Sequence, residues 1–453
     1  MTHLTVREWG DVRVESIAGR SRAFTDRQAI ALCNAARAHP NANRHGTNIL
    51  IDRRDKLVAQ QMVGVLSAPD CSLEILPKLD PDAPEAMDAN ACEAERQSER
   101  IRLVQMLDVA FELGLSAGSG DSMAHTAPSL LEILIANFAD KLLTEVRRGL
   151  PRRYLQCEND LSALRGRLDV TRQFSRNAVR PDRLACRFDQ LEADTPLLRI
   201  VASAVPFLQR HARLQENRRK LSELRHWLHE VPQMPIAQLP WKDVRITRAN
   251  KRWGELHRLA ELLLRRNWQS VDRDTNGVLG ITLLFPMNDL FEKYVAMLLR
   301  RALAPRGIKV LEQGGHRKCL GQWSEGEKLP TTEGQAFSTK PDIRLEREGR
   351  LLAVIDTKWK KMVAPTHKSH GLHQGDVYQL MAYARLYDGA DVALLYPSLP
   401  GQSERHHAPY GIAGGGERFD VMSVDVSAER TDVERQLATL CQRFAREAQT
   451  PSN

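Results

Sequence analysis

The sequence has no run of eighteen apolar residues, no Cys-Xaa-Xaa-Cys pair and no Gly-Lys-Ser/Thr core of a phosphate loop. Without the apolar run there is no membrane-spanning helix, and the polar N-terminus predicts no secretory signal. The seven cysteines are scattered, which indicates reduced thiols in the cytoplasm rather than a disulfide framework or a structural zinc site. Because the phosphate-loop core is missing, we expect that the chain does not hydrolyse a nucleotide itself.

Basic residues are in excess over acidic ones. Lys and Arg number 65 and Asp and Glu number 57, so the formal net charge is +8. A basic chain without a membrane segment favours a polyanionic partner, most simply nucleic acid. The alternative is a slightly basic enzyme with no such partner, and net charge alone does not separate the two.

Composition along the chain predicts an α+β multidomain protein. Residues 1–80 are typical of a small β-rich N-terminal domain, and residues 81–96 of an acidic linker. Residues 97–275 predict a mainly helical, arginine-rich middle domain. Helices mix with strands over residues 276–453, which indicates a C-terminal α/β domain.

Arginines are concentrated in the middle domain. Between Arg147 and Arg187 there are eleven arginines, no lysine and four acidic residues. Because the planar guanidinium matches phosphate geometry, this stretch, which includes Arg165 and Arg167, is a candidate surface for the DNA backbone. For any single arginine, a solvated helical surface is an equally good interpretation.

The stretch KPDIRLEREGRLLAVIDTKWKKM is the most informative pattern. A turn at Glu348–Gly349 predicts a hairpin of two strands. Asp342 then lies opposite Ile355 and so beside Asp356, within one residue of register. Asp356 and Lys358 lie two residues apart on one strand and therefore share a face. Two carboxylates and a lysine are thus predicted to converge at the end of a buried hairpin.

This set of side chains suits the hydrolysis of a phosphodiester. Carboxylate oxygens hold Mg²⁺, which polarises the phosphate and activates a water molecule. An adjacent lysine positions or deprotonates that water and offsets developing charge. This interpretation makes Asp342, Asp356 and Lys358 the catalytic residues, with the two aspartates as metal ligands. The alternative is an exposed hairpin with a surface ion pair.

Pro341-Asp342 and Asp356-Thr357-Lys358 resemble the Pro-Asp…(Asp/Glu)-Xaa-Lys nuclease superfamily. The resemblance implies a restriction-endonuclease-like fold for the C-terminal α/β domain. It also implies a further acidic metal ligand on the preceding helix, where Glu292 lies at the edge of an apolar stripe.

The same superfamily implies a helix after the hairpin that supports the active site or contacts DNA. Gln379 and Tyr383 lie four residues apart and hence on one face of such a helix. For these two residues and for Glu292, an ordinary solvent-exposed helix surface is the alternative.

Longer segments resemble the McrC family, the nuclease subunits of the McrBC modified-DNA restriction system. They occur in the family's order and span almost the whole chain: VGVLSAPDCSLEILPKL (63–79), CENDLSALRGRLDV (157–170), CRFDQLEADTPLLRI (186–200), FPMNDLFEKYV (285–295) and DVYQLMAYARLY (376–387). Leu198 departs from the pattern, which has Asn at that place.

The resemblance implies a type IV restriction endonuclease subunit that uses Mg²⁺ to cleave double-stranded DNA bearing 5-methylcytosine or another modified base. Its partner would be an AAA+ GTPase, McrB, which uses GTP, recognises and translocates the DNA, and is engaged and stimulated by the N-terminal part of this chain. Two complexes are expected to pair for double-strand cleavage. The implied role is antiviral defence against foreign, methylated DNA.

Two other functions stay open at this point. A repair or recombination nuclease of the same superfamily would carry the same residues, and a neighbouring helicase gene would favour it. A non-catalytic adaptor would bind and stimulate its AAA+ motor without cutting. The intact set of Asp342, Asp356 and Lys358 argues against such a decayed site.

Overall fold

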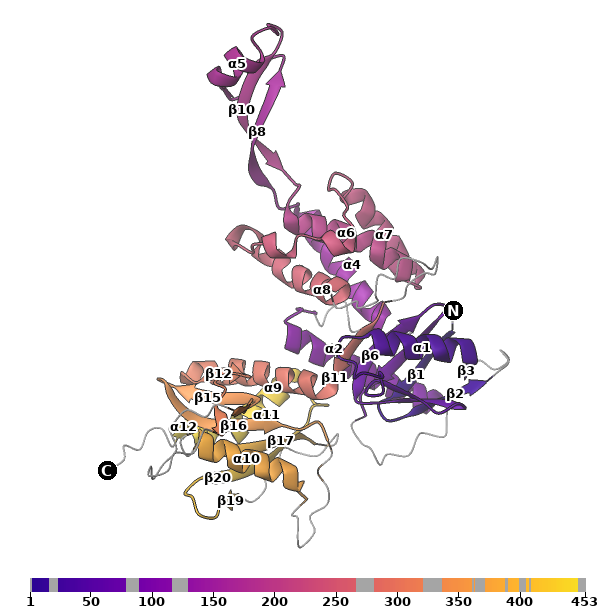
Figure 1. Ribbon diagram of the computed structural model, residues 1–453, viewed down its shortest axis with the longest axis vertical. Helices are drawn as coiled ribbons and strands as arrows, with labels where there is room; N and C mark the ends of the chain where they lie inside the picture. The colour runs from indigo at the N-terminus through magenta and orange to yellow at the C-terminus, as the bar shows by residue number, and fades with distance from the viewer. Residues whose placement is uncertain are drawn as a thin grey trace. The chain divides into compact units, whose positions relative to one another are not determined.

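The computed structural model divides the chain into two units, of which the second is inserted in the sequence of the first (Figure 1). Unit 1 comprises residues 1–114 and 269–453, and unit 2 comprises residues 115–268. The structure describes residues 2–15, 23–78, 89–115, 129–265, 281–320, 336–360, 362, 371–387, 390–398, 405–406 and 409–446. The elements in these ranges confirm the predicted α+β class. Among the described helices, none combines the length and hydropathy that a membrane span requires.

A four-stranded sheet in unit 1 combines strands from distant parts of the sequence. Its order is β1 (Thr2–Arg7), β7 (Cys71–Leu76), β6 (Met62–Ala68) and β11 (Leu283–Pro286). β1 runs parallel to β7, whereas β6 pairs antiparallel with both β7 and β11. β6 and β7 are buried along their whole length, which explains their apolar sequences. Through β11, the second segment of unit 1 begins inside the N-terminal sheet.

A smaller sheet shares a core with this one. Its order is β3 (Ala23–Thr25), β2 (Asp11–Glu15), β5 (Lys56–Ala59) and β4 (Leu50–Asp52). Helix α1 (Asp26–Ala38) begins with a capping box formed by Thr25 and Gln28. Phe24, Leu32 and Leu66 are fully buried in the common core.

Helix α2 (Ala89–Phe111) is bonded to the N-terminal sheet through a buried ion pair. Arg100 of α2 donates three hydrogen bonds of 2.8 to 3.1 Å to the carboxylate of Glu74 on β7. Both side chains are almost completely buried. Because a buried charge that loses its partner costs several kcal/mol, roughly 3 to 5, this pair holds α2 at one place on the sheet.

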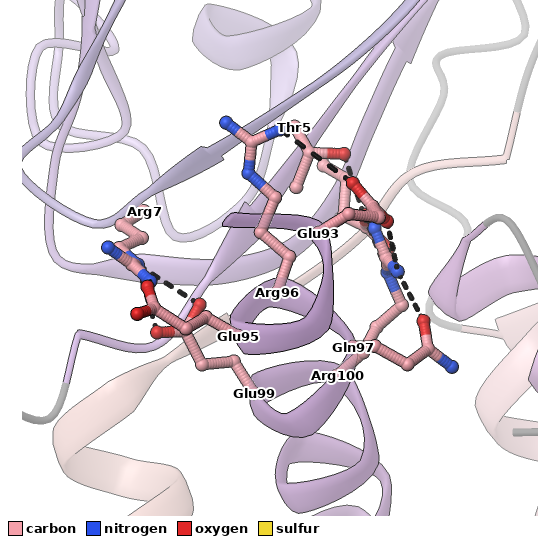
Figure 2. Close-up of polar contacts among 9 residues, drawn as sticks. Thr5, Arg7, Glu93, Glu95, Arg96, Gln97, Glu99 and Arg100 are labelled. Carbon is pink, nitrogen blue, oxygen red and sulfur yellow. Dashed lines mark hydrogen bonds and ion pairs between the residues drawn. The ribbon is translucent and has the colours of Figure 1, made fainter. Parts of the chain in front are cut away.

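The first residues of α2 correct the predicted linker. Residues 89–96 are helical, whereas we expected the whole of residues 81–96 to be a linker. Arg7 of β1 pairs with Glu95 at 2.8 Å and with Glu99 at 2.9 Å (Figure 2). Glu93 and Glu95, two of the acidic side chains that suggested an exposed linker, are therefore helix residues that bind arginines. The rest of the predicted linker lies outside the described residues.

The second large sheet of unit 1 is mixed. Its order is β12 (Lys309–Glu312), β15 (Ile343–Arg347), β16 (Arg350–Thr357), β17 (Asp391–Pro397), β20 (Arg418–Val424) and β18 (Arg405–His406), with β19 (Tyr410–Gly411) also paired to β20. β16, β17 and β20 are parallel, whereas β12 and β15 are antiparallel to their neighbours. The predicted catalytic residues Asp356 and Lys358 lie where β16 ends, at the carboxyl edge of the parallel strands.

Helices cover this sheet (Figure 1). α10 (Gln374–Leu386) packs through Leu380 and Tyr383 against Val354 and Val392 on one face. α9 (Met287–Leu303) follows β11 without a break and contacts β12 and β16. The remaining described elements here are the 3-10 helix η4 (Ala304–Arg306), β13 (Lys318–Leu320), β14 (Ala336–Ser338), α11 (Arg430–Leu440) and α12 (Gln442–Arg446).

Unit 2 combines helices with a three-stranded antiparallel sheet. The longer helices are α4 (Leu130–Arg148), α6 (Pro196–His211), α7 (Gln215–Trp227) and α8 (Gly254–Arg265). The sheet consists of β8 (Arg153–Leu161), β10 (Leu184–Glu192) and β9 (Arg167–Leu168), with the short helix α5 (Val170–Arg176) beside it. The middle of the chain is therefore less uniformly helical than we expected. Much of the arginine-rich stretch forms this sheet, in which β8 and β10 pair along their full length.

Candidate active site

The hairpin of β15 and β16 sets Asp342 beside Asp356, with a register that differs by one residue from the predicted one. Glu348 and Gly349 form the predicted turn, both with positive φ. A β-bulge midway along the hairpin then shifts the pairing, so that Ile343 lies opposite Ile355. Asp342, one residue before Ile343, is thereby brought level with Asp356. The prediction that Asp342 lies opposite Ile355 was wrong because an unbulged hairpin was assumed.

The carboxylate of Asp342 is oriented by the residue that follows Asp356. Its Oδ2 accepts a hydrogen bond of 2.8 Å from the backbone N–H of Thr357 and one of 2.9 Å from the Thr357 hydroxyl. Burial raises the pKa of Asp342, while the Thr357 hydrogen bonds and the Lys358 ammonium oppose that shift. Two bonds to one oxygen restrict the rotation of the carboxylate.

Asp356 and Lys358 lie on the same side, as predicted, and they form an ion pair at the end of β16. Asp356 Oδ2 lies 2.5 Å from Lys358 Nζ. Burial, and then the negative charge of Asp342, raises the pKa of Asp356 to about 6. Burial disfavours the Lys358 ammonium, but the charge and hydrogen bond of Asp356, together with the charges of Asp342 and Asp376, outweigh this and raise the pKa of the lysine. Asp356 Oδ1 is buried and has no hydrogen-bond partner among the described residues.

Helix α10 brings the predicted Gln379 and Tyr383 to this ion pair. Lys358 Nζ donates to Gln379 Oε1 at 3.3 Å, and Gln379 Nε2 donates to the Tyr383 hydroxyl at 2.8 Å. The Tyr383 hydroxyl donates in turn to the Lys340 carbonyl at 3.1 Å. Burial raises the pKa of Tyr383 to about 12, which keeps the phenol a donor. This chain of hydrogen bonds limits where the Lys358 ammonium can point.

Glu292 lies on α9 and is 7% exposed, which contradicts an ordinary solvent-exposed position. Its Oε2 accepts a hydrogen bond of 3.2 Å from Gln313 Nε2, and the Gln313 backbone N–H donates to the Asp342 carbonyl at 3.0 Å. Burial, and then the charge of Asp342, raises the pKa of Glu292 to about 7. The effect of Asp342 means that Glu292 lies within electrostatic range of the hairpin carboxylates.

These carboxylates can be tested as ligands for a metal ion. Within the described ranges, no group of three or more His, Cys, Asp or Glu side chains is arranged to hold a metal. The residues nevertheless fit Mg²⁺, which binds through one or two carboxylates and keeps several waters. Asp356 Oδ1 and Glu292 Oε1 are buried oxygens without a hydrogen-bond partner among the described residues, and a hard cation satisfies such oxygens. The predicted set of Asp342, Asp356 and Glu292 as ligands stays a prediction.

Comparison with known families places this geometry in context. Residues 57–397 match the family described as McrBC 5-methylcytosine restriction system component. The chain belongs to this family. The matched range contains all the site residues named above, from Glu292 to Tyr383. No curated protein matches the chain.

Solved structures of McrBC complexes from Thermococcus gammatolerans resemble this McrBC family member in fold. One is a refined half-complex from the tetradecameric assembly of McrB AAA+ hexamers with bound McrC. A chain of it is 20% identical with a TM-score of 0.70, over 98% of this chain and 100% of that chain. A chain of the cryo-EM structure of the McrBC complex is 24% identical with a TM-score of 0.52, over 67% of this chain and 88% of that chain.

The predicted Arg165 and Arg167 belong to unit 2 and not to the hairpin. The Arg165 guanidinium lies 4.1 Å from the ring centroid of Phe188 and donates to Gln190 Oε1 at 3.3 Å. Arg167 lies on β9, opposite Arg187 of β10. Contact with DNA by these arginines of the McrBC family member stays a prediction.

Sequence analysis missed three side chains that organise the site. Thr357 carried a signal, since it is the middle residue of Asp-Thr-Lys, but its two bonds to Asp342 depend on the bulged register. Gln313 carried none, because it lies in a polar stretch after β12 that belongs to no motif. Asp376 also lies on α10, and it pairs with Lys360 at 2.5 Å and accepts from the Tyr396 hydroxyl at 3.4 Å.

Proposed function

We propose that this chain is the Mg²⁺-dependent endonuclease subunit of a McrBC-type restriction system that cleaves modified double-stranded DNA. The observation that carries the proposal is the convergence of Asp342, Asp356 and Lys358 at one end of the β15–β16 hairpin in a McrBC family member. A restriction-endonuclease-like fold for the C-terminal domain of residues 276–453 is part of the proposal, supported by the mixed sheet with α9 and α10 packed against it.

Each side chain has a role that its contacts support. Asp342 and Asp356, with Glu292 as a further ligand, would hold Mg²⁺, which when bound polarises the phosphate and lowers the pKa of a bound water. Lys358 orients the attacking water and offsets the charge that develops on the phosphate. The Asp356 carboxylate and the Gln379 amide aim the lysine, and Tyr383 holds that amide.

The proposed partner is an AAA+ GTPase of the McrB type. The solved relatives in which McrB AAA+ hexamers occur with McrC support this assignment. GTP would be bound by the partner and not by this chain, whose sequence has no phosphate-loop core. Residues 1–80 would engage the partner, and two complexes would pair to cut both strands.

Cleavage of methylated plasmid by the full chain, with the candidate AAA+ partner, GTP and Mg²⁺, tests the proposal. Asp356→Asn preserves volume but removes a charged ligand, so the cleavage rate is expected to fall at least about a hundredfold. Asp432→Asn is the matched control, because Asp432 is a partly exposed aspartate of α11 that pairs only with Arg435 among the described residues. This control should cut like the wild type.

Other results would change the proposal in defined ways. Cleavage by the wild type without partner or nucleotide would support the nuclease assignment but refute the proposal that cleavage depends on the AAA+ partner and GTP. Equal cleavage by wild type and Asp356→Asn would refute the hairpin as the active site. If neither protein cut while the GTPase rate of the partner rose, the adaptor function would replace the nuclease.

A further inference from the structure

Trp359 follows the proposed catalytic lysine and connects it to two other parts of unit 1. Trp359 is 7% exposed, and 5.4 Å separates the centroid of its ring from that of Phe291. Phe291 precedes Glu292 on α9. The Trp359 Nε1–H donates a hydrogen bond of 2.7 Å to Oε1 of Glu8. Trp359, the neighbour of Lys358, thus contacts both the neighbour of Glu292 and the N-terminal domain.

Glu8 is an acidic residue in a place that disfavours charge. It follows β1, is 1% exposed, and its backbone N–H donates to the Leu76 carbonyl at 2.9 Å. Its Oε1 accepts a second hydrogen bond, of 2.9 Å, from the backbone N–H of Lys78. Burial raises the pKa of Glu8 to about 7, although the Trp359 hydrogen bond opposes that shift. A buried carboxylate costs stability, and here only Oε1 is hydrogen-bonded among the described residues, so a role in fixing the indole explains its presence.

A second connection runs from the same domain to α9. β11 pairs with β6 of the N-terminal sheet and continues directly into α9, where Glu292 lies one and a half turns from the start. The N–H of Met287, the first residue of α9, donates to the Gln61 carbonyl at 3.4 Å. The N-terminal domain therefore reaches Trp359 in two ways. It contains Glu8, which bonds to the indole, and it continues through β11 into α9, on which the indole packs.

We propose that Glu8 is a positioning residue of the nuclease site, because its hydrogen bond to the Trp359 indole fixes the backbone that carries Lys358 and, through Phe291, the turn of α9 that carries Glu292. This inference rests on the proposed function, since it assigns Glu8 to the same reaction. Glu8 does not touch the substrate. It acts through Trp359, so its loss should lower the rate of the chemical step more than the affinity for DNA.

The test uses variants that remove the hydrogen bond from either side. Glu8→Leu removes the acceptor, Trp359→Phe removes the donor, and Glu8→Gln retains an acceptor oxygen for the indole N–H. With the full chain, partner, GTP and Mg²⁺, the first two should lower kcat about tenfold or more with little change in KM for DNA. Glu8→Gln should retain most of the wild-type kcat. Trp227→Phe, an exposed tryptophan of α7, is the matched control for loss of an indole.

The double variant Glu8→Leu/Trp359→Phe completes a cycle. Because both changes remove the same bond, kcat of the double variant should be no lower than kcat of the less active single variant. Thermal unfolding of each variant shows whether it folds. If Glu8→Leu does not fold, Trp359→Phe tests the inference in its place. Wild-type kcat in Glu8→Leu and Trp359→Phe, or losses that multiply in the double variant, would overturn the inference.

Failure of the inference is distinct from failure of the proposed function. If wild type cuts, Asp356→Asn does not, and Glu8→Leu cuts at the wild-type rate, only the positioning role is refuted. If wild type and Asp356→Asn do not differ, the hairpin is not the active site and the positioning role falls with it.

Discussion

His211, at the end of α6, is a buried side chain whose charge depends on pH. Its ring lies edge-on against Phe207, with 4.8 Å between the ring centroids. Burial, and then the charge of Arg210, lowers the pKa of His211 from 6.5 to about 4. The unfolded chain therefore binds a proton here between those two values, and the folded chain does not. The free energy of unfolding of unit 2 is expected to be unaffected by this group above about pH 6.5 and to fall as the pH decreases toward about 4.

His211→Gln removes the titrating group, so the loss of stability on acidification should be smaller than in the wild type. Urea unfolding of the full chain across this pH range, monitored by far-ultraviolet circular dichroism, measures the slope. An equal slope in both proteins would assign the acid sensitivity to other groups, such as His257, whose pKa burial also lowers.

At the scale of residues, the sequence predicted the side chains that lie close together along the chain. Asp356 and Lys358 share a face because of strand alternation, and Gln379 and Tyr383 because of helical spacing. Glu8 could not be found in this way. Its bond to Trp359 joins residues 351 positions apart, and no periodic pattern encodes such a contact.

At the scale of elements, the pairing of β6 with β11 depends on a glycine. Gly64 has a φ of +126°, and a Cβ there would lie 1.9 Å from the carbonyl oxygen of Leu283. Gly64→Ala is expected to lower the free energy of unfolding by about 3 kcal/mol, because the strands must separate to admit the methyl group. Because β11 leads into α9, the cleavage rate should fall as well.

Urea unfolding of Gly64→Ala and of Gly411→Ala gives the comparison. Nothing lies within 4 Å of a Cβ built at Gly411, so that variant should differ from the wild type by less than about 0.5 kcal/mol. Equal stability of Gly64→Ala and wild type would show that β11 does not need the close approach.

Sequence analysis failed for two elements, the β15–β16 hairpin and the start of α2. The bulge in the hairpin leaves no trace in the alternation of Ile343 and Leu345, yet it decides which residue Asp342 faces. The start of α2 resembled a linker because Glu93 and Glu95 are charged. Whether such residues are solvated or bonded to arginines depends on tertiary contacts that a local pattern does not contain.

At the scale of the whole molecule, unit 1 is assembled from two separate stretches of sequence. Residues 1–115 and 281–453, expressed together as two chains, are expected to associate through β6–β11 pairing and through contacts of α2 with α9. Copurification of an untagged fragment with its tagged counterpart measures this association, and Gly64→Ala in the first fragment should weaken it. Independent folding of the second fragment as a stable monomer would contradict the shared sheet.

The insertion of unit 2 between α2 and β11 has an evolutionary consequence. Every residue assigned to catalysis, together with Glu8 and Trp359, belongs to unit 1, whereas the arginine-rich sheet belongs to unit 2. Insertions, deletions or exchange within residues 129–265 alter one unit without interrupting the strands that carry the carboxylates. The inserted segment can thus vary while the proposed nuclease site of unit 1 stays intact.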